Sequence, residues 1–413
     1  MKQTLAQKLV ARAAGRTSVT PGEIVTCKVD LAMMHDSSGP RRVKPMLEHL
    51  GAKVWDPSKV VVITDHYLPA YDDESRKIIS IARQWVREAG IDRFYDAQGI
   101  CHIVLPERGH LRPGMFAVGG DSHSPTGGAF AAYMFGIGAT EMVGVLVTGE
   151  IWLKVPHTIA MEFEGALGDG VAAKDVMLFL IGRFGMDGGQ YQAVEYRGDA
   201  IRKLSMQERM TLCNMTAELG GQVGLIASDS VTRDFLKTEI ETWEGDADAP
   251  LLAHHRFNAD ELAPQVAAPH SPANARSVDQ FKDLRIDLAY IGACTGAKLE
   301  DLRMAARVLR GRKSAVKLLV APASVRDQQS AEREGTLQVL LDAGAELLAN
   351  SCGMCAGYGE HLLPDNAVAI STTARNFKGR MGAASAQVYL ASPYTVAASA
   401  VAGRVCDPRE MLA

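Results

Sequence analysis

Short apolar runs and longer amphipathic segments alternate along this chain. The short runs suit β-strands, and they fall at residues 60–64, 116–118, 158–163, 287–291, 316–320 and 367–371. The longer segments carry apolar residues at helical spacing, at residues 76–89, 205–220 and 298–309. Strands that alternate with helices are typical of parallel sheets covered by helices. The pattern therefore predicts an α/β fold.

One part of the chain interrupts this alternation. Residues 244–277 are rich in Asp, Pro, Ala and His and show no clear period. We interpret them as a long connection that crosses to another domain. Because 413 residues are too many for one small core, we predict three domains, at residues 1–155, 156–283 and 284–413.

Two stretches, residues 122–140 and 381–403, carry no charged side chain. The second is long enough to resemble a membrane span, but Gln387 and the pair Ser392-Pro393 interrupt it, so we predict a buried loop and helix. The N-terminus is basic and amphipathic and loosely resembles a transit peptide. Since Thr4 is a suitable cap, we interpret this segment as the first helix of the mature fold.

Composition and net charge limit which binding partners and which cellular compartment we expect. The net charge is −4, so no global basic field draws the chain to nucleic acid or to a membrane surface. An anionic ligand must then be held by local arginines. Seven cysteines are an odd number, which argues against a disulfide framework and favours a reducing compartment. We expect a cytoplasmic protein.

Three cysteines form the most informative group. Cys352 and Cys355 make a CxxC step, and Cys294 lies earlier in a Gly-Ala-Cys-Thr-Gly sequence. Three thiolates are one too few for a closed site with four ligands. The spacing alone leaves three interpretations open: an iron–sulfur cluster, a zinc site completed by a histidine, or no metal. Small residues around each cysteine favour the cluster, because backbone N–H groups can then approach the sulfurs.

Carboxylates also lie beside imidazoles. Asp65 precedes His66, and Asp121 is two residues before His123. An aspartate can fix the tautomer of a histidine and leave its other nitrogen free to move a proton. A single pair is more often a buried histidine satisfied by an acid. Two pairs, together with His102, favour acid–base chemistry.

Two further pairs are weaker signals. Asn214 and Glu218 are four residues apart and share one face of a predicted helix, although a solvated edge would show the same pattern. Arg375 and Arg380 follow a predicted strand. Arginine forks bind carboxylates through two hydrogen bonds, although a charged surface turn is an equally good interpretation.

The candidates share a place in the predicted fold. Asp65, Asp121, Cys294 and Arg375 each come just after a predicted strand. Ligand sites in open α/β sheets lie at the carboxyl ends of the strands. We therefore expect these groups to converge on one cleft.

Taken in order, the sequence motifs resemble the aconitase superfamily, specifically the large subunits of 3-isopropylmalate dehydratase and homoaconitase. The resemblance spans residues 4–405. Its motifs are TDH at 64–66, GICH at 99–102, GGDSH at 119–123, CNMTAE at 213–218, GACTG at 292–296, SCGMC at 351–355 and RNFKGR at 375–380.

The resemblance implies three α/β domains around a [4Fe–4S] cluster held by Cys294, Cys352 and Cys355, with one iron free to bind substrate. It also implies two groups of site residues. Residues that move protons or lie beside the open iron would be Asp65, His66, His102, Asp121, His123 and Glu218. Residues that contact substrate would be His35, Ser122, Asn214, Arg375 and Arg380.

The resemblance further implies that part of the site is supplied from elsewhere. In this family the catalytic serine lies on a swivel domain, for which we find no room in the chain, so we expect a separate small subunit to carry it. The expected activity is that of a hydro-lyase or isomerase large subunit, which reversibly dehydrates a 2-hydroxy dicarboxylate of the 3-isopropylmalate type.

Some residues differ from the family pattern. Ala374 stands where an asparagine is usual, and residues 124–128 read SPTGG, which is closer to the aconitase style. Lys378 and Met381 replace a common Glu and Gln. These differences concern the substrate, so a smaller diacid (citraconate or methylmalate, dimethylmalate, maleate) is an alternative. Another is a non-catalytic relative that binds RNA, which the absence of a basic stripe disfavours.

Overall fold

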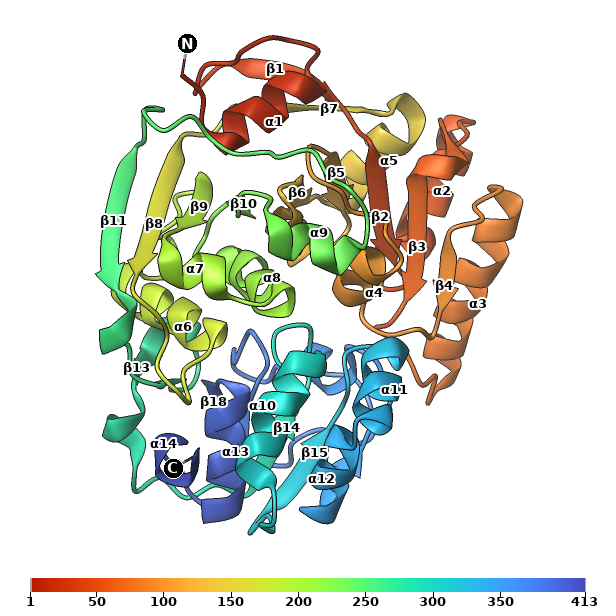
Figure 1. Cartoon of the computed structure of the whole chain (residues 1–413). Helices are drawn as coiled ribbons and strands as arrows, with labels where there is room; N and C mark the ends of the chain where they lie inside the picture. Colours follow the sequence, from red (N-terminus) through yellow and green to blue (C-terminus); the bar gives the residue numbers. More distant parts are fainter. Residues whose placement is uncertain (1, 413) are drawn as a thin grey trace.

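The computed structural model describes residues 2–412 as an α/β protein built on three largely parallel sheets. Figure 1 shows the first two sheets side by side above the third. One continuous buried apolar cluster contains Met33, Ile159 and Ala289, one residue from each sheet. The three sheets therefore share a core, and the predicted fold class is confirmed.

The first sheet has five parallel strands in the order β4-β3-β2-β5-β6. The strands are β2 (Leu31–His35), β3 (Val60–Thr64), β4 (Phe94–Asp96), β5 (Phe116–Gly119) and β6 (Tyr133–Gly136). Their covering helices are α2 (Pro40–Leu50), α3 (Asp73–Glu88), α4 (Cys101–Glu107) and α5 (Ala139–Thr148). Every residue of β3 is buried, which is why its sequence is a continuous run of apolar side chains without alternation.

A short antiparallel pair, β1 (Ile24–Lys28) and β7 (Glu150–Lys154), lies beside the first helix, α1 (Leu5–Ala13). The Thr4 hydroxyl accepts a hydrogen bond from the Gln7 amide at 3.3 Å, and the Gln7 side chain accepts one from the Thr4 amide at 2.9 Å. This reciprocal cap confirms that the N-terminal segment begins a helix of the fold.

The second sheet has four parallel strands in the order β10-β9-β8-β11. The strands are β8 (Thr158–Glu164), β9 (Ala193–Arg197), β10 (Val223–Leu225) and β11 (Ala253–Asn258). The helices are α6 (Ala173–Phe184), α7 (Asp199–Lys203), α8 (Met206–Asn214) and α9 (Ser230–Leu236). The single helix predicted over residues 205–220 is shorter in the structure. The α-helix ends at Asn214 and continues as one 3₁₀ turn, where the Thr216 hydroxyl binds the Leu212 carbonyl.

The third sheet has seven strands in the order β13-β12-β18-β17-β14-β15-β16. The strands are β12 (Gln265–Ala267), β13 (Ala275–Ser277), β14 (Leu288–Ile291), β15 (Lys317–Val320), β16 (Ala345–Leu347), β17 (Val368–Ser371) and β18 (Gln387–Ala391). The helices are α10 (Leu299–Leu309), α11 (Val325–Arg333), α12 (Thr336–Asp342), α13 (Pro393–Ala402) and α14 (Arg409–Leu412). Strands β12 and β13 are antiparallel additions at one edge.

The range predicted as a connection, residues 244–277, therefore contains strands of two sheets. Strand β11 pairs with β8 of the second sheet, whereas β12 pairs with β18 of the third. Strands β12 and β13 have three residues each, too few to show a period in the sequence.

The uncharged range 381–403 forms the inner strand β18 and the buried helix α13. The predicted buried helix is confirmed, whereas part of the predicted loop is a strand. Among residues 2–412, no helix combines the length and the apolar character that crossing a bilayer requires.

Candidate functional site

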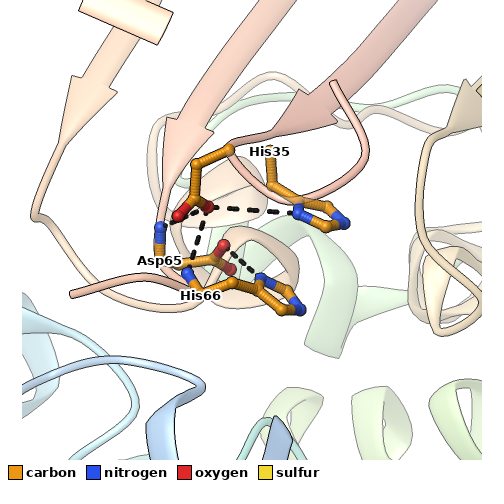
Figure 2. A group of neighbouring side chains, drawn as sticks. His35, Asp65 and His66 are labelled. Carbon is orange, nitrogen blue, oxygen red and sulfur yellow. Dashed lines mark hydrogen bonds and ion pairs between the residues drawn. The ribbon is translucent and has the colours of Figure 1, made fainter. Parts of the chain in front are cut away.

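The site begins where β3 ends. The Asp65 carboxylate lies 2.6 Å from Nδ1 of His66 (Figure 2). It accepts a second hydrogen bond, 2.7 Å long, from the Cys101 amide. Although burial disfavours the charged ring, the Asp65 carboxylate raises the pKa of His66 to about 10. The same pairing holds the pKa of Asp65 below its ordinary value. His66 is therefore an imidazolium at neutral pH and carries a proton that it can donate.

Asp36 fixes this turn, and sequence reasoning did not single it out. Its buried carboxylate accepts hydrogen bonds from the amides of Asp65, His66 and Tyr67 at 3.0, 3.0 and 2.7 Å. The signal available in the sequence was its position directly after β2, beside His35. The His35 ring stacks on His66 with centroids 4.0 Å apart, so the ends of β2 and β3 form one unit.

Asp121, just after β5, contacts three histidines. Its carboxylate lies 2.7 Å from Nε2 of His102 and 3.5 Å from Nε2 of His35, and it accepts the His123 amide at 2.8 Å. Burial alone would raise the pKa of Asp121, but the hydrogen bond from His102 and the nearby imidazoles hold it well below its usual range. Burial lowers the pKa of His102, which favours the neutral ring. Asp121 therefore orients a neutral histidine for proton transfer.

Glu218 connects the second sheet to both of the others. Its Oε1 lies 3.0 Å from Nε2 of His123 and accepts a 2.6 Å hydrogen bond from Nε of Arg375. Glu218 and Asn214 are each 1% exposed, which excludes the interpretation of this helix face as a solvated edge. Arg375 is largely buried in this ion pair, so it is not part of a charged surface turn.

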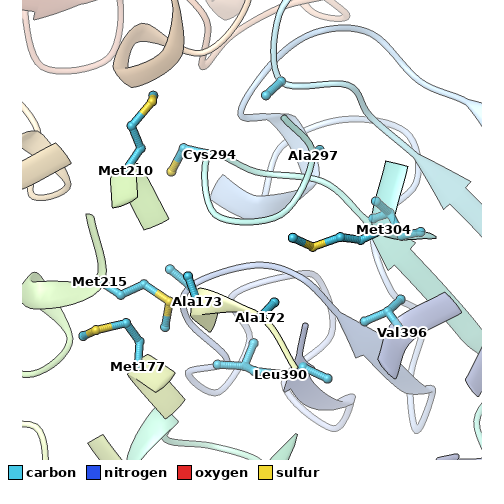
Figure 3. Packing of buried hydrophobic residues seen from close by; sticks show 14 of the residues in the cluster. Ala172, Ala173, Met177, Met210, Met215, Cys294, Ala297, Met304, Leu390 and Val396 are labelled. Carbon is cyan, nitrogen blue, oxygen red and sulfur yellow. The ribbon is translucent and has the colours of Figure 1, made fainter. Parts of the chain in front are cut away.

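The three cysteines lie where the third sheet meets the others. Cys294 follows β14, and Figure 3 shows it on its loop near Met210 of α8. Cys352 and Cys355 lie close enough for each thiol to shift the pKa of the other. The Cys352 amide donates to the Asp65 carbonyl at 2.8 Å, which attaches the CxxC turn directly to the first sheet.

The electrostatic surroundings of the Cys294 and Cys355 thiols differ. Burial raises the pKa of Cys294 to about 12. The pKa of Cys355 is instead lowered, first by the Cys352 thiol and then by the nearby Arg380 guanidinium. An arginine beside a thiol is an arrangement that stabilises a thiolate, the form that binds metal.

Unpaired polar atoms gather around these thiols. Five buried side-chain polar atoms lack a hydrogen-bond partner within residues 2–412, and three of them belong to predicted site residues: Asn214 Oδ1, Glu218 Oε2 and Arg380 Nε. Asn214 also donates to the Cys294 sulfur at 3.2 Å. Buried polar atoms are rarely left unpaired, so this group is arranged for a ligand. Three thiols with unpaired donors and acceptors beside them fit an iron–sulfur cluster and a polar substrate.

Two buried lysines, which the sequence reasoning missed, lie behind the cysteine loop. Nζ of Lys298 donates to the Cys294 carbonyl at 3.1 Å and pairs with Asp301 at 2.6 Å. Nζ of Lys174, on α6, binds the Thr372 and Thr373 carbonyls at 2.7 and 2.8 Å. No sequence pattern near Lys174 predicts these contacts, because its partners lie in loops of another sheet.

The site opens to solvent through a cavity of about 380 Å³ whose wall includes Asp121, Ser122 and Arg375. The exposed Ser122 lies at this opening. The contacts described above link the side chains of His35, Asp65, His66, His102, Asp121, His123, Glu218 and Arg375. Asn214 contacts Cys294, and Cys352 and Cys355 follow β16. The cavity is lined by residues of the first two sheets' loops and by Arg375 of the third.

The chain matches a known family over nearly its whole length. Residues 6–284 and 276–403 match the model of the aconitase family (aconitate hydratase).

Curated proteins of several organisms are similar. A Methanopyrus kandleri protein described as 3-isopropylmalate dehydratase large subunit 1 is 43% identical over 420 residues, which cover 100% of both chains. A Methanosarcina mazei protein described as a probable methanogen homoaconitase large subunit is 44% identical, over 93% of this chain and 99% of that one. The 3-isopropylmalate dehydratase large subunit of Moorella thermoacetica is 39% identical, over 100% of both chains.

Among solved structures, the holo form of aconitase X from Thermococcus kodakaraensis has a similar fold. The TM-score is 0.51 at 14% identity, and the match covers 85% of this chain and 84% of that one.

Proposed function

This chain belongs to the aconitase family, and we propose that it is the cluster-bearing large subunit of a hydro-lyase that reversibly dehydrates a 2-hydroxy dicarboxylate of the 3-isopropylmalate type. The names of the similar proteins support the reaction and the substrate class. The observation that carries the proposal is the connected group of two Asp–His pairs, Glu218 and Arg375, together with Asn214, which donates to the Cys294 sulfur and keeps an unpaired oxygen.

The cysteines would hold the cofactor. We propose that Cys294, Cys352 and Cys355 ligate three irons of a [4Fe–4S] cluster, because their thiols lie together beside Arg380 and the Asn214 amide. When bound, the cluster supplies a Lewis acid for the substrate hydroxyl and a carboxylate.

The surrounding side chains supply the acid–base chemistry. We propose that His66, held as an imidazolium by Asp65, gives its proton to the departing hydroxyl group. Asp121 orients His102 and lies beside His35, and these groups hold water and substrate in place. Asn214 and Glu218 then offer their unpaired oxygens to the bound water or the substrate hydroxyl.

Arginines and Ser122 would bind the substrate carboxylates. Arg375 is tied to Glu218 through Nε only, and its two terminal nitrogens make no hydrogen bond within residues 2–412. Arg380 is close to Cys355 and has an unpaired Nε. Guanidinium forks bind carboxylates through two parallel hydrogen bonds, and the Ser122 hydroxyl at the opening adds a further donor.

We propose that a separate small subunit covers the cavity and supplies the base for the carbon-bound proton. The similar proteins are named large subunits, which supports such a partner. The three sheets support the proposed domains at 1–155, 156–283 and 284–413, with the short strands β12 and β13 joining the third sheet from the second range. All seven cysteines are free thiols, which supports a reducing compartment such as the cytoplasm.

The test is anaerobic reconstitution of the purified chain with iron, sulfide and the small subunit of the same organism. Turnover is then measured with 3-isopropylmalate, homocitrate, citramalate, dimethylmalate and malate. We expect cluster absorption in the large subunit, and turnover of 3-isopropylmalate only when both subunits are present. Zinc without iron in anaerobically purified protein, or full activity of the isolated chain, would contradict the proposal.

A further inference from the structure

Lys174 is a fully buried cation with an unusual set of partners. It lies in the first turn of α6, beside the second sheet, and is 1% exposed. Its Nζ donates to the Thr295 hydroxyl at 3.2 Å and to the carbonyls of Thr372 and Thr373 at 2.7 and 2.8 Å. An ammonium group has three N–H donors, so these partners use all of them.

Its partners belong to the two loops that carry the chemistry of the third sheet. Thr295 follows Cys294 in the loop after β14, and Thr373 is two residues before Arg375 in the loop after β17. The two loops also bind each other, because the Thr372 hydroxyl donates to the Gly292 carbonyl at 2.8 Å. One side chain from the second sheet therefore fixes a cysteine loop and an arginine loop together.

The charge of Lys174 is not paired. No ion pair joins Lys174 to a carboxylate within the described range, whereas the neighbouring Lys298 is paired with Asp301 at 2.6 Å. Burying an ammonium group without a counter-charge is costly. In accord with that cost, burial lowers the pKa of Lys174 to about 8, which still leaves it protonated at neutral pH.

Apart from Asp301, which is paired with Lys298, the candidates for a counter-charge are thiols. Cys294 and Cys355 both act electrostatically on Lys174, and each becomes a negative thiolate when it binds metal. In the free protein no negative group within residues 2–412 is paired with Lys174. Thiolates bound to a metal would supply negative charge near it. Asp301 also acts on Lys174, but its carboxylate is already occupied by Lys298.

We propose that Lys174 is a positioning residue of the cluster site. It holds the Cys294 and Arg375 loops in register, and its positive charge offsets the negative charge of the cluster-bound thiolates. The inference rests on the proposed function, since it assumes that the thiols bind an iron–sulfur cluster. A cation fixed behind the thiolates stabilises the more negative, reduced state of a cluster and so raises its reduction potential.

The experiment compares Lys174→Met and Lys174→Gln, which remove the charge, with Lys174→Arg, which keeps it. Lys203→Met is the matched control, because Lys203 is an exposed lysine on α7 of the same sheet that also binds one carbonyl. Each full-length protein is reconstituted anaerobically. The measurements are cluster loss to a chelator, the reduction potential by electron paramagnetic resonance, and thermal unfolding of the protein before iron is added.

We expect Lys174→Met and Lys174→Gln to lose the cluster about tenfold faster than wild type and to have a more negative reduction potential. We expect Lys174→Arg and Lys203→Met to keep the wild-type potential. If Lys174→Arg does not fold, the inference is tested by comparing the two neutral variants with Lys203→Met.

An unchanged potential in both neutral variants would overturn the inference and leave Lys174 a purely structural tie. Failure of both neutral variants to fold before iron is added would overturn it in the same way. Failure of the wild-type protein to bind any cluster would instead overturn the proposed function, and this inference with it. A wild type that binds a cluster and turns over, with neutral variants that behave identically, would overturn only the role of Lys174.

Discussion

At the scale of single residues, the site depends on carboxylates that each serve several partners. Asp65 binds the His66 ring and the Cys101 amide, while its own carbonyl receives the Cys352 amide. The sequence predicted the Asp65–His66 pair because the two are adjacent. It did not predict the ion pair of Glu218 with Arg375, because those residues come from different sheets and no local pattern relates them.

The charge of His66 gives a prediction about pH. Its pKa is raised from 6.5 to about 10 by Asp65, so the folded protein keeps a proton that the unfolded chain releases. This contribution to stability is fully present below pH 6.5 and is lost as the pH rises towards 10. We expect the free energy of unfolding of the cluster-free protein to fall over this window, by at most about 1.4 kcal/mol per pH unit from this group.

The measurement is a histidine NMR titration of the cluster-free protein, with urea unfolding at several pH values. The His66 ring should remain protonated at pH 8 in wild type, and Asp65→Asn should bring its pKa to the ordinary value of about 6.5 or lower. A His66 ring that titrates near 6.5 in wild type would show that Asp65 does not hold it charged.

Arg380 gives a second residue-scale prediction. Lysine is a point charge, and it cannot reproduce the fork that binds a carboxylate through two hydrogen bonds. We expect Arg380→Lys to lower kcat/KM about tenfold or more in the reconstituted enzyme. The control is Arg404→Lys, since Arg404 is exposed just after α13 and donates to a backbone carbonyl. Equal kinetics for the two variants would remove Arg380 from the substrate site.

At the scale of elements, the loops that follow the strands carry the site side chains, and the strands fix where those loops lie. The sequence predicted β3, β5, β14, β15 and β17 from short apolar runs, and β8 from an alternating pattern. It missed β12 and β13: β12 pairs with β18, and β13 pairs with β12 at the sheet edge. Strands of three residues are too short to show a pattern. The fully buried β2 was not predicted either.

Gly296 gives a prediction at this scale. A Cβ atom there would lie 2.1 Å from Cβ of Thr372, in the adjacent loop after β17. We expect Gly296→Ala to force the two loops apart, to destabilise the fold by about 2 kcal/mol or more, and to weaken cluster retention.

The matched control is Gly144→Ala, because Gly144 lies inside α5 with no atom within 4 Å of its added Cβ. That variant should be neutral or more stable by about 0.5–1 kcal/mol. Both are measured by thermal unfolding and by iron content after reconstitution. Equal stability of the two variants would mean that the loops adjust freely and do not hold the site by close packing.

At the scale of the whole molecule, one cleft is built from residues far apart in the chain. The first sheet supplies the Asp–His pairs, the second supplies Asn214 and Glu218, and the third supplies the cysteines and arginines. The sequence predicted this convergence from one general rule, that ligands bind at the carboxyl ends of strands. It could not predict which atoms would meet, because that depends on how three separate sheets pack.

Cys355→Ser tests the cluster at this scale. The apolar core that joins the three sheets includes Met354 of the cysteine turn but not Cys355 itself, so we expect the variant to fold and to lose both iron and turnover. Cys27→Ser is the control, because Cys27 is buried in the first half of the chain far from any predicted ligand in sequence. The measurements are circular dichroism, iron and sulfide content, and activity with the small subunit. Iron and turnover that survive in Cys355→Ser would exclude this thiol as a ligand.

The position of the reactive groups in loops also bears on how such an enzyme changes during evolution. The turns after β5 and β17 carry Ser122, Ala374 and Arg375, while the strands beneath them belong to the shared core. Substitutions in these turns alter what is bound without disturbing the sheets that hold them. Changes confined to these turns can therefore alter the ligand while the core beneath them stays the same.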